Sequence, residues 1–271
     1  MPFTDVRDVC LFFTDEGEGE PVLFVHGFSC DSHDWSWQLP YFMAAGYRVI
    51  AADLRGHGRS SVPANGFTPK DFADDLAILL ERLDPGPVIA IGHSLGGAIV
   101  STLAVEHPEM VRAIVSVDPG YLLPEAFRPM TDTAIEALSA GDPVATAQAF
   151  LGAAYAPASA PHLRSWHMRR IAGVPHHVLH GALAGLFDGP DALGFDTVSG
   201  PYLRRRTCPV LAFYVDPNRA AVEAGLMVDP RSKVVTFEGS GHWLHQERPD
   251  ETNHLITDWL ASLDGSAAEP T

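Results

Sequence analysis

The segment Val88–Ala98 constrains the fold of this 271-residue chain more than any other. It begins with the apolar run Val-Ile-Ala-Ile, continues with Gly-His-Ser-Leu-Gly around Ser94, and ends in small and apolar residues. A Gly-x-Ser-x-Gly sequence between a strand and a helix is typical of a sharp turn that lifts the serine hydroxyl above a sheet. Gly92 and Gly96 fit this turn because larger side chains would collide with the neighbouring backbone. The segment predicts a strand–turn–helix unit with Ser94 as a nucleophile.

Short β-branched apolar runs alternate with longer helical patterns along the rest of the chain. This alternation is typical of parallel strands joined by crossover helices. We expect strands at Val22–Val25, Tyr47–Ala52, Val88–Ile91, Val111–Val117, Val210–Val215 and Lys233–Phe237, with an added edge strand at Val9–Thr14. Helical patterns that begin near Asp71 and span Pro249–Leu263 each keep their large apolar residues on one face. The pattern predicts a sheet covered by helices on both faces.

The long interval between Val117 and Pro209 interrupts this rhythm. Its apolar spacing predicts helices at Thr131–Ser139, Pro143–Tyr155, Leu163–Ile171 and His176–Phe187. An interval of this length inside a compact domain is usually functional. We therefore expect a helical cap at 119–205 on a core formed by 1–118 and 206–271. The larger apolar residues of the cap fit either a substrate pocket or the cap's own interior, namely Tyr155, Trp166, Met168, Leu183 and Phe187.

Composition excludes several classes of partner. The chain has 18 Lys and Arg against 34 Asp and Glu, a formal charge of −16, which repels nucleic acid and anionic lipid. No stretch approaches the roughly 18 apolar residues of a membrane span, and the first residues lack the pattern of a signal peptide. Cys10, Cys30 and Cys208 are far apart and have no metal-ligand spacing. We expect a cytoplasmic protein with reduced thiols and a small-molecule substrate; the sequence does not indicate an oligomeric state.

A serine hydroxyl is a weak nucleophile that needs a general base, and the base needs an acid to orient it. Among 13 histidines, His242 stands out because it follows a predicted strand in a glycine-containing loop late in the chain. This place fits the chain order serine, acid, histidine. We expect His245 to support that loop, His93 to bond beneath the Ser94 turn, and His26 to serve the backbone geometry of its own turn.

Four motifs in order complete the pattern: His26-Gly-Phe28, Asp53-Leu-Arg-Gly-His-Gly-Arg-Ser60, Gly92-His-Ser-Leu-Gly-Gly97 and Gly241-His-Trp-Leu-His-Gln-Glu-Arg-Pro249. With them the chain resembles α/β-hydrolase-fold serine hydrolases from about Val22 to Leu260. The resemblance implies an α/β-hydrolase fold, with a mostly parallel sheet of the eight-stranded type, flanking helices and a helical cap inserted after strand six. It also implies Ser94 as nucleophile, His242 as base, and the backbone N–H groups of Phe28 and Leu95 as the oxyanion hole.

The acid departs from the commonest pattern of this family. Most members carry it after the seventh strand, where the count from Pro209 reaches Asn218, and an amide cannot stabilise an imidazolium as a carboxylate does. Asp216 lies two residues earlier, directly before a proline. Asp118 follows the sixth strand, where many haloalkane dehalogenases, zearalenone-type lactonases and cofactor-free quinolone dioxygenases have their acid. We expect Asp118 to be the acid, with Asp216 as the alternative; Asp118 could instead cap the chain where it enters the cap.

The cap also contains five histidines: His162, His167, His176, His177 and His180. The i, i+4 spacing of His176 and His180 could hold a metal on one helix face, but no Cys, Asp or Glu converges nearby in the sequence. We therefore expect surface or pocket-lining histidines, and neither a metal nor an organic cofactor.

These residues predict a serine hydrolase that cleaves a carboxylic ester or lactone of a small to medium hydrophobic substrate. A cofactor-free dioxygenase is an alternative, although Leu95 and Cys30 stand where those enzymes tend to carry histidine. A non-catalytic ligand receptor on the same scaffold is another. A dehalogenase or an epoxide hydrolase is disfavoured because both need a carboxylate nucleophile and residue 94 is serine.

Overall fold

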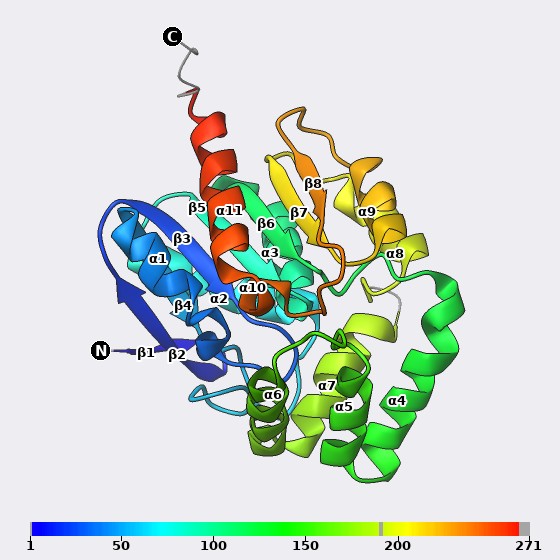
Figure 1. Cartoon of the computed structure of the whole chain (residues 1–271). Coiled ribbons are helices and arrows are strands. Elements are labelled where there is room, and N and C mark those ends of the chain that lie inside the picture. Colours follow the sequence, from blue (N-terminus) through cyan, green and yellow to red (C-terminus); the bar gives the residue numbers. More distant parts are fainter. Residues whose placement is uncertain (1, 190–191, 266–271) are drawn as a thin grey trace.

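A single mixed sheet organises the molecule. The computed structural model describes residues 2–189 and 192–265. Within them, eight strands pair in the order β1-β2-β4-β3-β5-β6-β7-β8 (Figure 1). Their bounds are β1 Phe3–Val6, β2 Val9–Glu16, β3 Glu20–Val25, β4 Tyr47–Ala52, β5 Val88–His93, β6 Val111–Val117, β7 Val210–Tyr214 and β8 Lys233–Thr236. The pairs β1–β2 and β2–β4 are antiparallel and the others are parallel, so the expected mostly parallel sheet with a helical insert after β6 is confirmed.

Helices cover both faces because successive residues of each inner strand point to opposite sides of the sheet. The helices are α1 Gln38–Ala44, α2 Pro69–Leu83, α3 Leu95–Glu106, α4 Arg128–Ala140, α5 Pro143–Gly152, α6 Pro161–Gly173, α7 His176–Phe187, α8 Asp196–Leu203, α9 Pro217–Ala224, α10 Leu244–Glu247 and α11 Pro249–Leu263. On β3, Leu23 and Val25 pack in the core that contains α2 and α3. Val22 and Phe24 pack in the core that contains α1 and α11. Every residue of β5 is buried, which explains its continuous apolar sequence.

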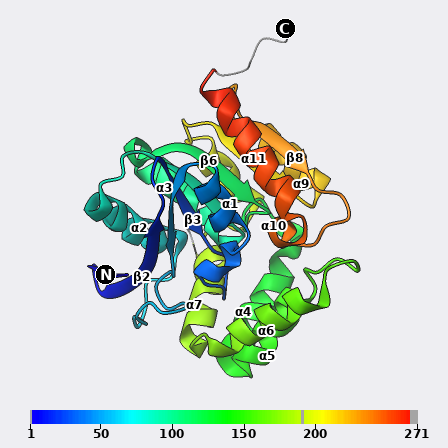
Figure 2. The ribbon, with the colours of Figure 1, turned by 60° about the vertical axis from the view of Figure 1, so that its left-hand side comes forward.

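The insert between β6 and β7 contains α4 to α8. Figures 1 and 2 show α4, α5, α6 and α7 grouped together below the sheet. Helix α7 lies directly on the loop before α2, since a Cβ at Gly181 would meet the ring of Phe67 at 2.5 Å. The division into a core of 1–118 and 206–271 and a cap of 119–205 stays a prediction.

The structure corrects two expectations about the elements. Val9–Thr14 is not an edge strand: β2 pairs with β4 on one side and with the outermost strand β1 on the other. Strand β1 has only four residues, Phe-Thr-Asp-Val, and too little apolar character to indicate a strand. The predicted helix Pro143–Tyr155 ends at Gly152. Helix α8 also went unpredicted, because its sequence Asp-Thr-Val-Ser-Gly-Pro-Tyr-Leu carries a glycine and a proline and no clear amphipathic period.

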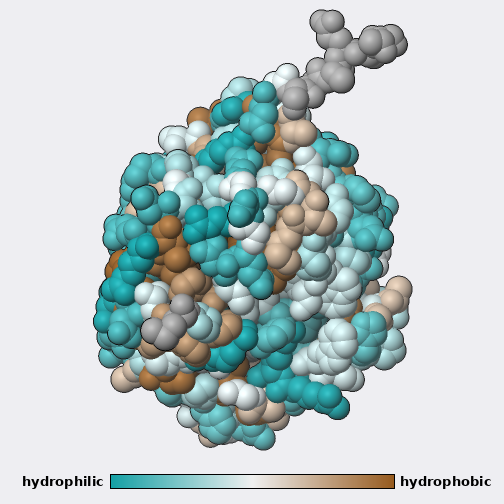
Figure 3. Space-filling view, turned by 90° about the vertical axis from the view of Figure 1, so that its left-hand side faces the viewer, coloured by the Kyte–Doolittle hydropathy of each residue, from teal (hydrophilic) through white to brown (hydrophobic). Residues whose placement is uncertain are grey.

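The hydropathy of the surface residues agrees with the acidic composition of the chain. On the face shown in Figure 3, hydrophilic and intermediate residues predominate, and strongly hydrophobic ones gather in limited patches. Among the residues described, no helix combines the length and the apolar character that a bilayer span requires.

Candidate active site

Ser94 lies at the turn between β5 and α3, as the sequence predicts. Its φ of 54° and ψ of −116° are unusual for a residue with a side chain, and such a conformation costs on the order of 1–3 kcal/mol. A Cβ at Gly92 would collide with the carbonyl of Gly96, and a Cβ at Gly96 would collide with the carbonyl of Val25. Gly92 is therefore required by the close approach of the two ends of this turn, and Gly96 by the approach of the turn to β3. The serine itself is only half-buried, so its hydroxyl is accessible to a substrate.

The structure brings Asp118 and His242 together. Asp118 follows β6 directly, is 3% exposed, and has a φ of 36°. Its Oδ2 lies 2.5 Å from Nδ1 of His242, which comes from the loop after β8. Because Nδ1 donates to the carboxylate, Nε2 on the other side of the ring is available as a proton acceptor. Ser94 is close to this pair through its backbone, since its N–H donates to the carbonyl of Val117 at 3.0 Å.

The Asp118 carboxylate is kept ionised by its neighbours. Burial raises the pKa of this carboxyl, but the hydrogen bond from His242 and the positive charge of Arg219 more than offset burial, so the pKa lies below its ordinary value. Nη1 of Arg219 is 3.4 Å from Oδ1 of Asp118, and Nη2 donates to the carbonyl oxygens of Pro119 and Tyr121. Arg219 thus holds the carboxylate and the backbone that follows it. Nothing in the sequence around Arg219 predicts its contact with Asp118.

Asp216 lies elsewhere. Its Oδ1 accepts hydrogen bonds from the backbone N–H of Asn218 at 2.8 Å and from the Asn218 side chain at 3.2 Å. This is an N-cap at the start of α9, a role in which aspartate is common. Asn218 itself is exposed. Of the two carboxylates that the sequence offered, the one in contact with His242 is Asp118.

The expected oxyanion residues flank Ser94 on both sides. Leu95 is the first residue of α3, so its N–H lacks a partner within the helix. The loop of Phe28 lies against the nucleophile turn, since a Cβ at Gly27 would be 3.1 Å from the Cβ of Ser94. Phe28 and Leu95 are both buried. Two backbone N–H groups directed at one substrate oxygen can stabilise an oxyanion, and this role of Phe28 and Leu95 stays a prediction.

Comparison with known proteins agrees with this geometry. The family model described as alpha/beta hydrolase fold matches residues 20–249. The chain belongs to the α/β-hydrolase fold family. It is 29% identical to a 2-(acetamidomethylene)succinate hydrolase from Mesorhizobium japonicum, over 94% of this chain and 93% of the relative. It is 40% identical to a non-heme haloperoxidase from Rhodococcus erythropolis, over 40% of this chain and 39% of the relative.

Solved structures give the same family. The structure of Est816, described as an N-acyl homoserine lactone degrading enzyme, superposes with a TM-score of 0.81 and 25% identity. The superposition covers 95% of this chain and 99% of Est816. These relatives include hydrolases and a haloperoxidase, so they support an α/β-hydrolase enzyme without determining its substrate.

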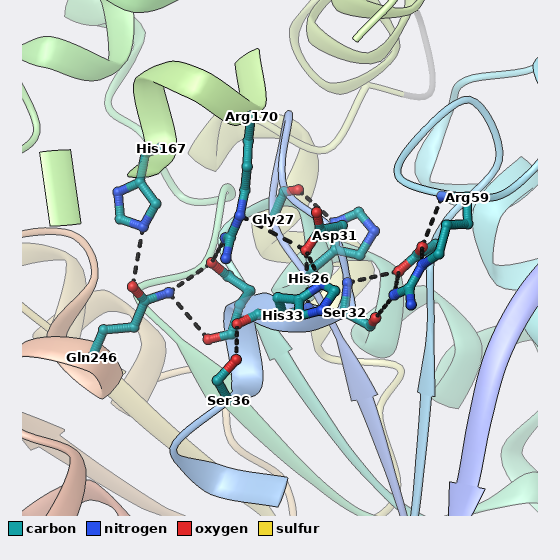
Figure 4. Close-up of polar contacts among 12 residues, drawn as sticks. His26, Gly27, Asp31, Ser32, His33, Ser36, Arg59, His167, Arg170 and Gln246 are labelled. Carbon is teal, nitrogen blue, oxygen red and sulfur yellow. Dashed lines mark hydrogen bonds and ion pairs between the residues drawn. The ribbon is translucent and has the colours of Figure 1, made fainter. Parts of the chain in front are cut away.

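A buried ionic cluster lies behind the active site of this α/β hydrolase. Its centre is Asp34, in the short 3₁₀ helix Ser32–Trp35, with none of its surface exposed. Oδ1 accepts from Nη1 of Arg170 at 3.1 Å and from Nε2 of Gln246 at 2.7 Å (Figure 4). Oδ2 faces Nδ1 of His93 at 3.3 Å and Nε2 of His245 at 3.6 Å. Burial raises the pKa of Asp34, but its close approach to His245 and His93 brings it well below its ordinary range.

Asp34, His93 and His245 are also the described residues whose potential metal-ligand atoms come together, all within 4.8 Å of one another. They do not fit a divalent cation, because the guanidinium of Arg170 and the amide N–H of Gln246 are already directed at the same carboxylate. The cluster is better described as an ion-pair network. The sequence gave no signal for it, since its members come from four separate segments.

The remaining candidates from the insert between β6 and β7 divide into two groups. His176, His177 and His180 line a cavity of about 650 Å³ beside Asp142 and Pro143, away from Ser94. The five apolar cap residues differ in exposure: Leu183 and Phe187 are buried, Met168 and Tyr155 pack on the core, and Trp166 is 43% exposed. Leu183 and Phe187 therefore belong to the interior of the molecule.

Buried histidines should make folding stability depend on pH. Burial lowers the pKa of His57 to about 3 and the pKa of His167 and His245 to about 4. In the unfolded chain these groups bind protons near pH 6.5, so between pH 6.5 and 4 the unfolded state binds more protons than the folded state. We expect the free energy of unfolding to fall between pH 7 and pH 5, by about 2 kcal/mol for each histidine.

Urea denaturation at pH 7 and pH 5 measures this difference. His57→Gln should reduce it, whereas His254→Gln should not, because His254 is exposed. The carboxyl of Asp53 does not affect the comparison, because its pKa is lowered to about 2 and its contribution changes only below this window. An equal free energy of unfolding at both pH values would contradict the prediction.

Proposed function

We propose that the protein is a serine hydrolase that cleaves a carboxylic ester or lactone of a small to medium hydrophobic substrate. The observation that carries this proposal is the 2.5 Å contact between Asp118 and His242, formed beside the strained turn of Ser94. A buried carboxylate that orients a histidine next to an accessible serine is the arrangement used for acyl transfer.

In the proposed mechanism the Oγ of Ser94 attacks the substrate carbonyl, and Nε2 of His242 takes the hydroxyl proton. Asp118 remains ionised and stabilises the imidazolium. The negative charge on the former carbonyl oxygen is held by the N–H groups of Phe28 and Leu95, each donor contributing on the order of 3–4 kcal/mol. Collapse of the tetrahedral intermediate breaks the C–O bond, and His242 gives its proton to the leaving oxygen. A water molecule then attacks the acyl-enzyme with the same assistance and restores Ser94.

Two observations support an ester or lactone substrate. Est816, which is 25% identical over nearly its whole length, is described as degrading N-acyl homoserine lactones. Asp118, the proposed acid, also follows β6 rather than β7. The sequence shares this placement with zearalenone-type lactonases, and also with many haloalkane dehalogenases and cofactor-free quinolone dioxygenases. A cytoplasmic location stays a prediction, supported by the three free cysteines Cys10, Cys30 and Cys208.

A second candidate is hydrolysis of an acylaminomethylene dicarboxylate. The relative from Mesorhizobium japonicum, which aligns over most of both chains, is named for such a succinate derivative. A cavity of about 210 Å³ beside Ser29 and Cys30 is lined by Arg169 and Arg170, with Asp31 as the opposing charge. Arg170 is already paired with the buried Asp34, so Arg169 is the guanidinium that could bind a substrate carboxylate next to the loop that carries Phe28.

An activity-based probe tests the proposed nucleophile before a substrate is known. We expect a fluorophosphonate to add once to the wild-type protein, and intact-mass spectrometry should show this adduct. Ser94→Ala should remove it because the nucleophile is gone, and His242→Ala should remove it because the hydroxyl is no longer activated. An unlabelled wild type, or an adduct that persists in Ser94→Ala, would contradict the proposal.

Substrate panels then distinguish the candidates. Aryl esters and lactones test the first proposal, and an acylaminomethylene succinate tests the second. Oxygen uptake with a hydroxyquinolone and no ester turnover would support the dioxygenase alternative. A ligand that raises the melting temperature without being turned over would support the receptor alternative.

A further inference from the structure

The Asp34 cluster is connected to the proposed base through His93. Nε2 of His93 lies 3.0 Å from the carbonyl oxygen of His242. A carbonyl only accepts hydrogen bonds, so this ring nitrogen carries a proton and donates it. The other nitrogen, Nδ1, then faces Oδ2 of Asp34. Burial lowers the pKa of His93, and a neutral imidazole that donates from Nε2 has no proton on Nδ1, so His93 is fixed by its bond to the backbone of the proposed base and not by the carboxylate. Its ring lies 4.6 Å from the ring of His242.

The same carboxylate fixes the chain on the far side of His242. His245 and Gln246 belong to α10, which begins two residues after His242. Nε2 of His245 faces the Asp34 carboxylate, and Nε2 of Gln246 donates a hydrogen bond to it. Gln246 also donates to the backbone carbonyl of Asp34 at 3.1 Å. The loop that carries His242 is therefore bonded at its carbonyl to His93, and the helix that follows this loop, α10, is bonded to Asp34.

The insert takes part in this network through α6. Arg170 of α6 donates to Asp34, and His167 of the same helix is 3.0 Å from Oε1 of Gln246 (Figure 4). The other ring nitrogen of His167 is 2.8 Å from the hydroxyl of Tyr155. One buried carboxylate, that of Asp34, therefore contacts both α6 and the segment that follows His242.

We propose that Asp34 is a positioning residue for His242, acting through its hydrogen bonds with Gln246 of α10, and that Arg170 makes this positioning depend on the packing of α6 against the core. The inference rests on the proposed function of His242. Asp34 touches neither Ser94 nor the substrate in this scheme. Asp34 determines the position of the His242 imidazole. A displacement of about 1 Å at a general base can lower the rate of the catalysed reaction by as much as 100-fold.

Asp34→Asn tests the proposal because it keeps the shape of the side chain and removes its charge. We expect kcat and the rate of fluorophosphonate labelling to fall by about 10- to 100-fold, with KM within about twofold. Labelling should still reach completion, since Ser94 is intact. The proton between His242 and Asp118 should give a downfield NMR signal in the wild type, and this signal should shift or broaden in Asp34→Asn.

Asp75→Asn is the matched control. Asp75 is equally buried and is paired with the buried Arg55, but it has no contact with the His242 loop. We expect this variant to lose stability while its kcat and its downfield signal stay at the wild-type values. Equal effects of the two substitutions on kcat, or an unchanged labelling rate in Asp34→Asn, would overturn the proposal.

Arg170 provides a second test if Asp34→Asn does not fold. Its side chain is 18% exposed, so substitution there is less disruptive. Arg170→Met should reproduce the loss in kcat, and Arg170→Lys should recover most of it. An unlabelled wild type would instead count against the proposed function itself, so the two failures can be told apart.

Discussion

Ser94→Ala should abolish the turnover of any ester or lactone that the wild-type protein hydrolyses, with a loss in kcat on the order of 10⁶-fold. The loss is large because the hydroxyl forms the covalent bond of the acyl-enzyme and His242 and Asp118 act only through it. The melting temperature should change by no more than a few degrees. The Ser94 side chain does not cap α3, and alanine has the same Cβ as serine at a φ of 54°, so the backbone conformation costs the same in both proteins.

Steady-state kinetics and thermal denaturation of the purified variant measure both effects. Ser101→Ala is the control, because Ser101 is a fully buried serine on the same helix with no part in the proposed mechanism. That variant should keep its turnover. If Ser94→Ala retained wild-type turnover, the serine hydrolase proposal would have to be abandoned.

Asp118→Asn should lower kcat by about 10⁴-fold. An asparagine at this position can still accept a hydrogen bond from Nδ1 of His242, but its neutral amide cannot stabilise the imidazolium that forms when Ser94 is deprotonated. The amide can also turn its NH₂ group to the ring, which favours the wrong tautomer. Arg219 would at the same time lose the carboxylate that balances its charge. The measurement is kcat on the best ester or lactone from the panel.

Asp216→Asn is a matched control for this prediction. Asparagine caps a helix about as well as aspartate, so α9 should be unaffected. We expect kcat within about threefold of the wild type. A large loss in Asp216→Asn together with a small loss in Asp118→Asn would mean that the acid is Asp216, as the commoner family pattern has it.

Local sequence patterns predicted most of the fold. The nucleophile turn, the six inner strands and α11 follow from patterns within a few neighbouring residues, and the bounds of α7 were predicted at both ends. Strand β1 and helix α8 were missed because neither has a distinctive period. Strand β1 depends on its pairing with the adjacent β2. Helix α8 depends on contacts with the start of the insert, where Leu123 bridges to Phe195 and the N–H of Leu122 donates to Ser199.

The residues of the candidate site also fall into two groups: those that local motifs predicted, and those whose contacts depend on the folded chain. Ser94 and His242 could be proposed from motifs, and the sequence offered two carboxylates as partners for His242. The contact of Asp118 with His242 depends on where β6 ends relative to the loop after β8, which no local pattern records. The Asp34 cluster depends on four segments that meet only in the folded chain. Arg170 and Arg219 likewise have no neighbours in sequence that would indicate their partners.

The backbone at Ser94 and Asp118 has a consequence for how this chain can change over generations. Both residues have a positive φ, a conformation that glycine adopts more easily than serine or aspartate. Random substitution filtered for foldability alone would therefore drift toward glycine at these two positions. A hydroxyl and a carboxylate are nevertheless present at both. At position 94 the strained backbone lowers stability while the proposed chemistry needs the hydroxyl, and at position 118 the carboxylate also balances the charge of Arg219.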